Sequence, residues 1–192
     1  MENIEAQKIN KFSGGNNLLD AQYILTQKVK IQAGEVVADL GAGGAAYFTM
    51  QAAKIVGDQG QVYAVDVVKN VLSSIDSKAK MSGLYNVKTI WSNLEILGAT
   101  KIPEASLDHA MLINILFQSQ KKSEMITEAI RLLKPGGKLT IIDWSDNTPG
   151  FAPPQNLQVN KEEVLQIAQN LSLSLEEEFV AGNYHFGLIF IK

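Results

Sequence analysis

Residues 36–44 read Val36-Val37-Ala38-Asp39-Leu40-Gly41-Ala42-Gly43-Gly44 and combine two patterns that together point to one class of fold. The first half of this stretch is apolar and rich in β-branched residues, which is typical of a buried strand. Its second half is a glycine-rich turn, and a helical pattern over 44–56 follows it directly. Glycines at such a junction let the backbone turn sharply, and they let a ligand approach main-chain N–H groups at the positive end of a helix. The stretch therefore predicts the first strand–turn–helix unit of a ligand-binding α/β fold.

Strand and helix patterns alternate outward from this stretch. Further strands are predicted over 61–66, 87–91, 107–113 and 138–144, and helices over 69–81 and 123–133. This alternation implies right-handed crossovers and a parallel sheet that is covered on both faces. Near the end, Leu171, Leu173 and Leu175 alternate with serines, and the apolar run 184–191 follows a short Ala-Gly-Asn turn. Two strands joined in this way are antiparallel. The predicted fold class is α/β, a doubly wound, Rossmann-like sheet of five parallel strands plus a C-terminal antiparallel hairpin.

The remaining segments are expected to attach to this core. An Asn cap and apolar residues at helical spacing predict an amphipathic helix over 16–29. A length of 192 residues is consistent with one domain. We therefore expect a single domain over 1–192, with its parts in this order: a helical extension over 1–34, a cofactor-binding core over 35–144, a proline-rich loop over 145–160, and a helix with the hairpin over 161–192.

Composition limits the partners and the location. Seventeen basic residues against 20 acidic ones give a net charge of −3, so no overall positive field favours nucleic acid. The absence of cysteine excludes disulfides, thiolate zinc sites and cysteine nucleophiles. The first ten residues lack the apolar region of a signal peptide, and the longest nearly apolar run, 110–117, is far shorter than the roughly 20 residues that span a bilayer. We expect a cytoplasmic protein without a membrane span, and we predict no particular oligomeric state.

An acidic residue after the second predicted strand narrows the ligand class. Asp66 would lie beside the glycine turn, where its carboxylate can accept both hydroxyls of a ribose, so an adenosine-containing ligand is predicted. The turn from Gly41 to Ala46 also satisfies the dinucleotide fingerprint GxGxxG/A. Asp39 favours a different ligand, because a carboxylate two residues before the first glycine repels a pyrophosphate and tolerates a cation.

At these motifs the sequence resembles the class I S-adenosylmethionine-dependent methyltransferases, from about Phe12 to the C-terminus. Residues 39–43 resemble the family's D/E-x-G-x-G motif, and residues 62–66 its second motif with the ribose acid. Residues 132–138 resemble the turn before the fifth strand in the ubiquinone- and menaquinone-biosynthesis branch. The resemblance implies the seven-stranded methyltransferase fold, S-adenosylmethionine as cofactor with S-adenosylhomocysteine as product, and methyl transfer to O, N or C of a small-molecule acceptor.

The resemblance also implies a set of cofactor-binding residues. They are Asp39, Gly41, Ala42, Gly43, Asp66, Val67, Asn93, Leu94 and Asn114. In this set Asp39 would lie near the methionine ammonium, and Asp66 would hold the ribose. Asn93 stands where the family usually has an acid that meets the adenine amino group, and an amide oxygen can accept the same N–H. Asn114 matches the position that borders the methionine and the transferring methyl group.

Catalytic and metal-binding residues are less well marked. In-line methyl transfer needs no protein nucleophile, so a base for the acceptor's proton is the only candidate role. His109 lies inside a predicted strand and is interpreted as structural, whereas His185 opens the last strand and could point toward the carboxyl edge of the sheet. Asp143, Asp146 and Asn147 follow the fifth strand and could ligate Mg²⁺. The catechol-type magnesium site also needs an acid where this chain has an amide, so we expect loop caps and no metal.

Other functions stay open at this point. The alternatives are a nicotinamide-dependent oxidoreductase and a non-catalytic domain that binds S-adenosylmethionine or S-adenosylhomocysteine. Asp39 and the terminal hairpin argue against the oxidoreductase. Only a measurement of turnover distinguishes a non-catalytic binding domain from a methyltransferase. Trp144 and Phe151, beside the proline-rich loop, are interpreted either as a wall of an apolar acceptor pocket or as residues that pack on the domain edge. No motif encodes the identity of the acceptor.

Overall fold

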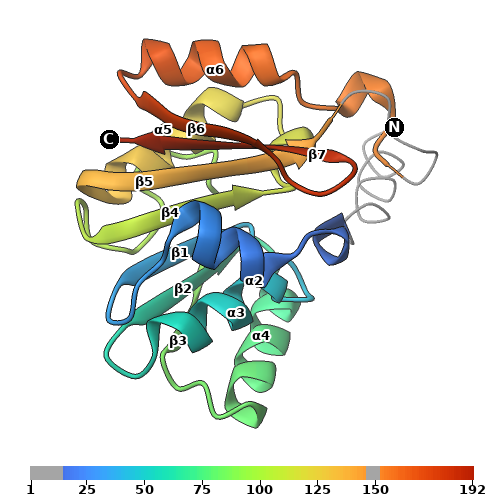
Figure 1. Cartoon of the computed structure of the whole chain (residues 1–192). Coiled ribbons are helices and arrows are strands. Elements are labelled where there is room, and N and C mark those ends of the chain that lie inside the picture. Colours follow the sequence, from blue (N-terminus) through green and yellow to red (C-terminus); the bar gives the residue numbers. More distant parts are fainter. Residues whose placement is uncertain (1–14, 146–151) are drawn as a thin grey trace.

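The computed structural model describes residues 15–145 and 152–192. Within these residues seven strands form one sheet in the order β3-β2-β1-β4-β5-β7-β6 (Figure 1). The strands are β1 (Val36–Leu40), β2 (Gln61–Asp66), β3 (Val87–Trp91), β4 (Leu107–Ile113), β5 (Leu133–Trp144), β6 (Ser174–Val180) and β7 (His185–Ile191). Strands β1 to β5 run parallel to one another, and β7 pairs antiparallel with both β5 and β6. The predicted architecture of five parallel strands with a C-terminal antiparallel hairpin is therefore confirmed.

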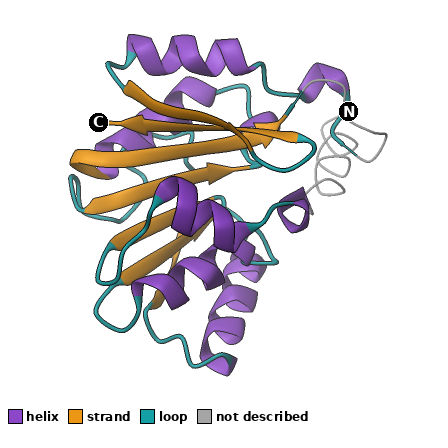
Figure 2. Cartoon of the chain, viewed as in Figure 1, coloured by secondary structure: helices purple, strands orange, loops and turns teal. Residues whose placement is uncertain are grey.

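Helices cover both faces of this sheet (Figure 2). The helical segments are η2 (Gly15–Leu18), α2 (Ala21–Tyr23), η3 (Ile24–Val29), α3 (Tyr47–Val56), α4 (Lys69–Met81), η4 (Leu116–Gln118), α5 (Lys122–Leu132), η5 (Gln155–Leu157) and α6 (Lys161–Asn170). Buried side chains of α5 and α6 form one hydrophobic cluster with the sheet, and those of α2, η3 and α3 form a second cluster. No helix in the described ranges is long and apolar enough to cross a membrane.

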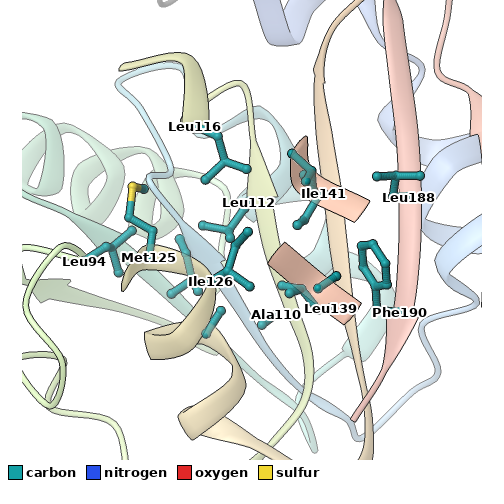
Figure 3. Close-up of a cluster of buried hydrophobic side chains, with 14 of the residues drawn as sticks. Leu94, Ala110, Leu112, Leu116, Met125, Ile126, Leu139, Ile141, Leu188 and Phe190 are labelled. Atoms are coloured by element: carbon teal, nitrogen blue, oxygen red, sulfur yellow. The ribbon is translucent and has the colours of Figure 1, made fainter. Parts of the chain in front are cut away.

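The central strand β4 shows why the parallel strands are apolar along their whole length. Leu112 of β4 packs in the cluster that contains Ile126 of α5 and Ile141 of β5 (Figure 3). Met111 and Ile113 alternate with Leu112 and pack in the other cluster, with α2, η3 and α3. Both sets of side chains are buried because helices cover both faces of a parallel sheet.

Two helical regions differ from the prediction. The helix predicted over 16–29 is broken into η2, α2 and the π-helical η3, and the chain leaves it through Lys30, which has a left-handed φ of 62°. The strand predicted to include Leu171 and Leu173 begins only at Ser174. Leu171 still donates its backbone N–H to carbonyl groups of α6, and Ser172, with φ of 61°, turns the chain toward β6.

Strand β5 begins earlier than predicted, at Leu133. Its pairing with β4 shifts register between Leu107 and His109, and Gly136 has a φ of 78°. The Lys-Pro-Gly-Gly segment therefore bulges out of the ladder before regular pairing resumes. The predicted loop over 145–160 contains η5 in its described part, whereas residues 146–151, Phe151 included, lie outside the described ranges.

Candidate functional site

The chain turns from β1 into α3 through residues with a left-handed backbone. Gly41, Gly43 and Ala46 have φ values of 88°, 64° and 53°. This conformation delays the start of α3 to Tyr47, later than predicted. Gly41 meets a second constraint, because a Cβ at this position would lie 2.7 Å from Cγ1 of Ile115. The turn therefore requires glycine at position 41, and it exposes its backbone to the carboxyl edge of the sheet.

Asp66 ends β2 beside this turn and is held by two backbone groups. Its Oδ2 accepts the N–H of Gly43 at 3.1 Å, and its Oδ1 accepts the N–H of Val68 at 2.8 Å. A carboxylate oxygen can accept about two hydrogen bonds, so each oxygen keeps capacity for a further donor. The carboxylate is thus fixed in orientation and still able to accept the two hydroxyls of a ribose.

A cavity of about 270 Å³ lies at the carboxyl ends of the parallel strands. This edge includes the boundary between β1 and β4, where the strand order reverses and open α/β sheets bind ligands. The cavity wall brings together these residues that the sequence singled out: Gly41, Gly43, Asp66, Val67, Asn93, Leu94 and Asn114. It also contains residues that sequence analysis missed, among them Asn16, Gly44, Ser92, Glu95, Gln118, Ser119 and Met125.

Asp39 and Ala42 are buried beneath the turn and do not line this cavity. Asp39 is only 3% exposed, and the hydroxyl of Thr49 in α3 donates to its Oδ2 at 2.6 Å. Burial raises the pKa of Asp39 to about 6, although the hydrogen bonds from Thr49 oppose that rise. The carboxylate predicted to lie near an ammonium group therefore ties β1 to α3 and stands behind the cavity wall.

Asn114 follows β4 and lines the cavity, and its side chain has one acceptor without a partner among the described residues. It has a left-handed φ of 53° and is 5% exposed. Its Nδ2 donates to Oδ1 of Asn16 at 2.8 Å, whereas its own Oδ1 is buried without a partner in the described part of the chain. A buried carbonyl oxygen without a donor is costly, so this atom suits a ligand that carries an N–H group.

The segment after β3 adds a carboxylate that the sequence did not single out. Oδ1 of Asn93 accepts the backbone N–H of Glu95 at 2.9 Å. Oε1 of Glu95 accepts the hydroxyl of Ser119 at 2.6 Å. Both Asn93 and Glu95 therefore present oxygen acceptors where the resemblance expects the adenine amino group. Leu94 and Met125 add apolar surface to the same wall and lie close together (Figure 3).

The two histidines lie away from the cavity wall. His109 is buried in β4, and its Nε2 lies 2.9 Å from Oε2 of Glu35, just before β1, which supports the structural interpretation. His185 is 1% exposed, and its ring lies 4.3 Å from that of Trp144. Neither ring nitrogen of His185 has a partner among the described residues, and burial lowers its pKa to about 4. His185 is therefore a neutral, buried group at neutral pH.

Asp143 has the predicted capping role. It accepts backbone N–H groups of Leu116, Phe117 and Trp144, at 3.1, 3.4 and 2.9 Å respectively. Burial raises its pKa to about 7 despite these hydrogen bonds. No cluster of potential metal ligands occurs in the described ranges, and Asp146 and Asn147 lie outside them. Trp144 is buried and does not line the cavity.

The wall fits a ligand with an adenosine part and a cationic amino-acid part. Asp66 suits ribose hydroxyls, Asn93 and Glu95 suit an amino group on a base, and the unpaired oxygen of Asn114 suits an ammonium. Neither histidine nor cysteine stands among the described wall residues. The arrangement can therefore hold and align small molecules for a transfer between them, and it provides no thiol or imidazole as a covalent intermediate.

Comparison with known proteins identifies related sequences. A family model described as a methyltransferase domain matches residues 31–182. The ubiquinone/menaquinone biosynthesis C-methyltransferase UbiE of Marinomonas sp. (strain MWYL1) is 31% identical over 134 residues, which are 69% of this chain and 51% of that protein. A demethylmenaquinone methyltransferase of Listeria welshimeri is 33% identical over 124 residues, 64% of this chain and 51% of the relative. The chain thus spans about half the length of these curated relatives.

Solved structures share the arrangement of the sheet. A SAM dependent methyltransferase from Aquifex aeolicus has a TM-score of 0.83 at 25% identity, and the match covers 96% of this chain and 97% of that one. The cyclase SpnF has a TM-score of 0.74 at 14% identity, with coverages of 89% and 80%, which is a likeness of fold alone. Because one fold can host different reactions, the residues of the cavity carry the functional argument.

Proposed function

The chain belongs to the class I S-adenosylmethionine-dependent methyltransferases, and on this premise we propose that its cavity binds S-adenosylmethionine for methyl transfer to a small-molecule acceptor. The single observation that carries the proposal is the cavity itself. The left-handed glycine turn and the fixed carboxylate of Asp66 line it, and so does Asn114, whose side-chain oxygen has no partner among the described residues.

The proposed roles follow from the groups on the wall. Asp66 accepts the ribose hydroxyls, while the backbone at Gly41 and Gly43 lets the cofactor approach closely because no Cβ intervenes there. Asn93 or Glu95 accepts the adenine amino group, and Oδ1 of Asn114 accepts the ammonium. When bound, S-adenosylmethionine supplies a methyl group on a positively charged sulfur, which is already activated for displacement. The chain's own contribution is alignment of the acceptor and exclusion of water.

The acceptor class is suggested by the names of the relatives. Those names make a demethylated quinol the first acceptor to test, with a carbon of the ring as the site of methylation. A quinol loses an O–H proton readily, so weak general-base assistance suffices. The cytoplasmic location and the absence of nucleic acid as a partner stay predictions.

Titration calorimetry of the full chain with S-adenosylhomocysteine, S-adenosylmethionine and NADH tests the ligand class. We expect both adenosyl ligands to give a heat of binding. In thermal melts both should also raise the melting temperature, because a ligand that binds only the folded state stabilises it. NADH should give no heat of binding. Binding of NADH without binding of either adenosyl ligand would contradict the proposal and favour the oxidoreductase alternative.

Turnover is then measured with a labelled methyl donor and a reduced demethylmenaquinone. Label in the quinone product would establish methyl transfer. Tight binding of S-adenosylhomocysteine with no label transferred to this quinol or to a panel of phenols and amines would instead favour a non-catalytic binding domain.

A further inference from the structure

Two asparagines that are 98 positions apart in the sequence meet at the cavity. Asn16 lies in η2, and Asn114 follows β4. The side chain of Asn114 donates from Nδ2 to Oδ1 of Asn16 at 2.8 Å, and both residues line the cavity. This hydrogen bond links the first described segment of the chain to the centre of the sheet.

In the structure this bond occupies the donor end of the Asn114 amide and leaves its acceptor end without a partner among the described residues. An amide side chain has a donor end and an acceptor end, and rotation by about 180° exchanges them. Because Nδ2 is bound to Asn16, the free atom is Oδ1, which is buried and has no partner among the described residues. The backbone of Asn114 is held as well, since its N–H donates to the carbonyl of Ile142 at 2.8 Å and its carbonyl accepts Nε2 of Gln118 at 3.2 Å.

The position of Asn16 is also determined by close packing. A Cβ at Gly15 would lie 2.6 Å from Cζ2 of Trp144 and 3.0 Å from Nδ2 of Asn114. Only glycine lets this segment approach so closely. On the other side of Asn16, the buried Leu19 packs in the hydrophobic cluster of α2, η3 and α3, and its N–H donates to the carbonyl of Asn16 at 3.2 Å. Asn16 is thus anchored on both sides.

We propose that Asn16 is a positioning residue for the amino-acid end of the methyl donor. By accepting Nδ2 of Asn114, it directs Oδ1 of Asn114 toward the α-ammonium group of the bound ligand. This inference rests on the proposed function, because it assumes an adenosyl ligand with an amino-acid part. Without Asn16 the Asn114 amide is free to rotate and to present its NH₂ group, which has no favourable contact with an ammonium.

Two ligands distinguish this role from a general effect on the cavity. S-adenosylhomocysteine carries the amino-acid part, whereas 5′-methylthioadenosine has the same adenosine and thioether but lacks it. Calorimetry on the full chain is done with both ligands for the parent, Asn16→Leu, Asn16→Asp and the control Gln22→Leu. Gln22 lies in α2, is exposed and does not line the cavity. Thermal melts without ligand check that each variant is folded.

We expect Asn16→Leu to weaken S-adenosylhomocysteine binding about tenfold or more, as for loss of a hydrogen bond to a charged group, and to change 5′-methylthioadenosine binding less than about threefold. Asn16→Asp still accepts Nδ2 of Asn114 and should stay close to the parent, as should Gln22→Leu. In a background of Asn114→Leu, the further change Asn16→Leu should cost little, because Asn16 acts through Asn114.

Unchanged binding of S-adenosylhomocysteine by Asn16→Leu would overturn the inference, and so would equal weakening of both ligands. Additive losses in the double variant would show that Asn16 acts independently of Asn114, which also contradicts it. If the parent binds neither ligand, the proposed function fails first, and the inference fails with it.

Discussion

Asp66 shows how one side chain can connect the fold to the proposed site. Its two oxygens accept N–H groups from Gly43 in the turn and from Val68 before α4. These bonds orient the carboxylate before any ligand arrives, so a ribose would find both acceptors in place. At the same scale, Asn114 has a left-handed φ and a buried side-chain oxygen without a partner in the described ranges, two costly features of the kind that occur at functional sites.

Substitution of Asp66 tests its role as the ribose ligand. We expect Asp66→Ala to weaken S-adenosylhomocysteine binding by roughly 1.5–3 kcal/mol, the scale for hydrogen bonds to a charged group. Calorimetry measures the change, and thermal melts show whether the turn remains folded. Asp76→Ala is a matched control, because Asp76 lies in α4 and pairs with Lys80 at the surface. Binding as tight as in the parent would mean that Asp66 does not hold the ribose.

Lys78 of α4 supports the same turn from the outside. Its Nζ donates to the carbonyl oxygens of Gly44 and Ala45, at 2.6 and 3.4 Å, although the side chain is exposed. We expect Lys78→Gln to weaken S-adenosylhomocysteine binding by about threefold to tenfold with little change in the melting temperature, since an exposed contact contributes little to stability. Lys78→Arg should restore binding. Lys80→Gln, on the same helix, is the control; an equal effect of both substitutions would argue for a general change in charge.

At the scale of elements, α5 holds the segment between β3 and β4 through a buried ion pair. Glu128 is 0% exposed and accepts the backbone N–H groups of Gly98 and Thr100 at 2.8 and 3.0 Å. Nε and Nη2 of Arg131 donate to the same carboxylate, each at 2.8 Å. Burial on its own would raise the pKa of Glu128, but the hydrogen bonds from Arg131, Gly98 and Thr100 outweigh it and lower the pKa to about 2. The same segment contains the cavity residues Asn93 and Glu95, so α5 indirectly supports the site.

Removal of this carboxylate should destabilise the whole chain. Glu128→Ala leaves two backbone donors and a partly buried guanidinium without their acceptor, so we expect the free energy of unfolding to fall by about 3–5 kcal/mol. Denaturant unfolding followed by circular dichroism measures this change. Glu124→Ala, at an exposed position of the same helix, should change stability by less than about 0.5 kcal/mol. Similar midpoints for the two variants would refute the assigned role of Glu128.

At the scale of the whole molecule, burial creates titrating groups with opposing effects on stability. Burial lowers the pKa of His185 from 6.5 to about 4, and it raises the pKa values of Asp39 and Asp143 to about 6 and 7. As the pH falls below 6.5, unfolded chains take up a proton at His185 before folded chains do, so His185 lowers stability progressively down to about pH 4. The two aspartic acids act in the opposite sense, because the folded state binds their protons first.

Comparison of the parent with His185→Phe separates the effect of the histidine from that of the two aspartic acids. His185→Phe keeps a ring against Trp144 and removes the titration. We therefore expect the free energy of unfolding of the parent to fall relative to that of His185→Phe as the pH is lowered from 6.5 to 4. The slope is at most about 1.4 kcal/mol per pH unit. Denaturant unfolding at several pH values measures it. A difference that does not vary with pH in this range would show that His185 titrates normally in the folded chain.

Patterns of neighbouring residues predict the strands of the parallel sheet and mark the glycine-rich turn after β1. Strands 61–66, 87–91 and 107–113 and the helix 69–81 have the predicted limits, because alternation and helical periodicity are properties of neighbouring residues. The glycine turn and Asp66 were likewise found from local spacing. Element ends were predicted less well at α3 and β6, because left-handed residues such as Ala46 and Ser172 delay them and neither is a glycine that would mark the turn. The single-domain assignment over 1–192 stays a prediction.

Long-range packing places some of the predicted side chains on the cavity and buries others away from it. Asp39 belongs to the same motif as Gly41, yet packing of α3 against β1 buries it under Thr49. Asn16 and Asn114 meet because η2 lies at the end of β4. Glu95, which follows β3, accepts a hydrogen bond from Ser119, which follows η4. Such contacts join residues far apart in the chain, so no local period encodes them. They depend on the strand order and on how closely the covering segments pack, which only the folded molecule determines.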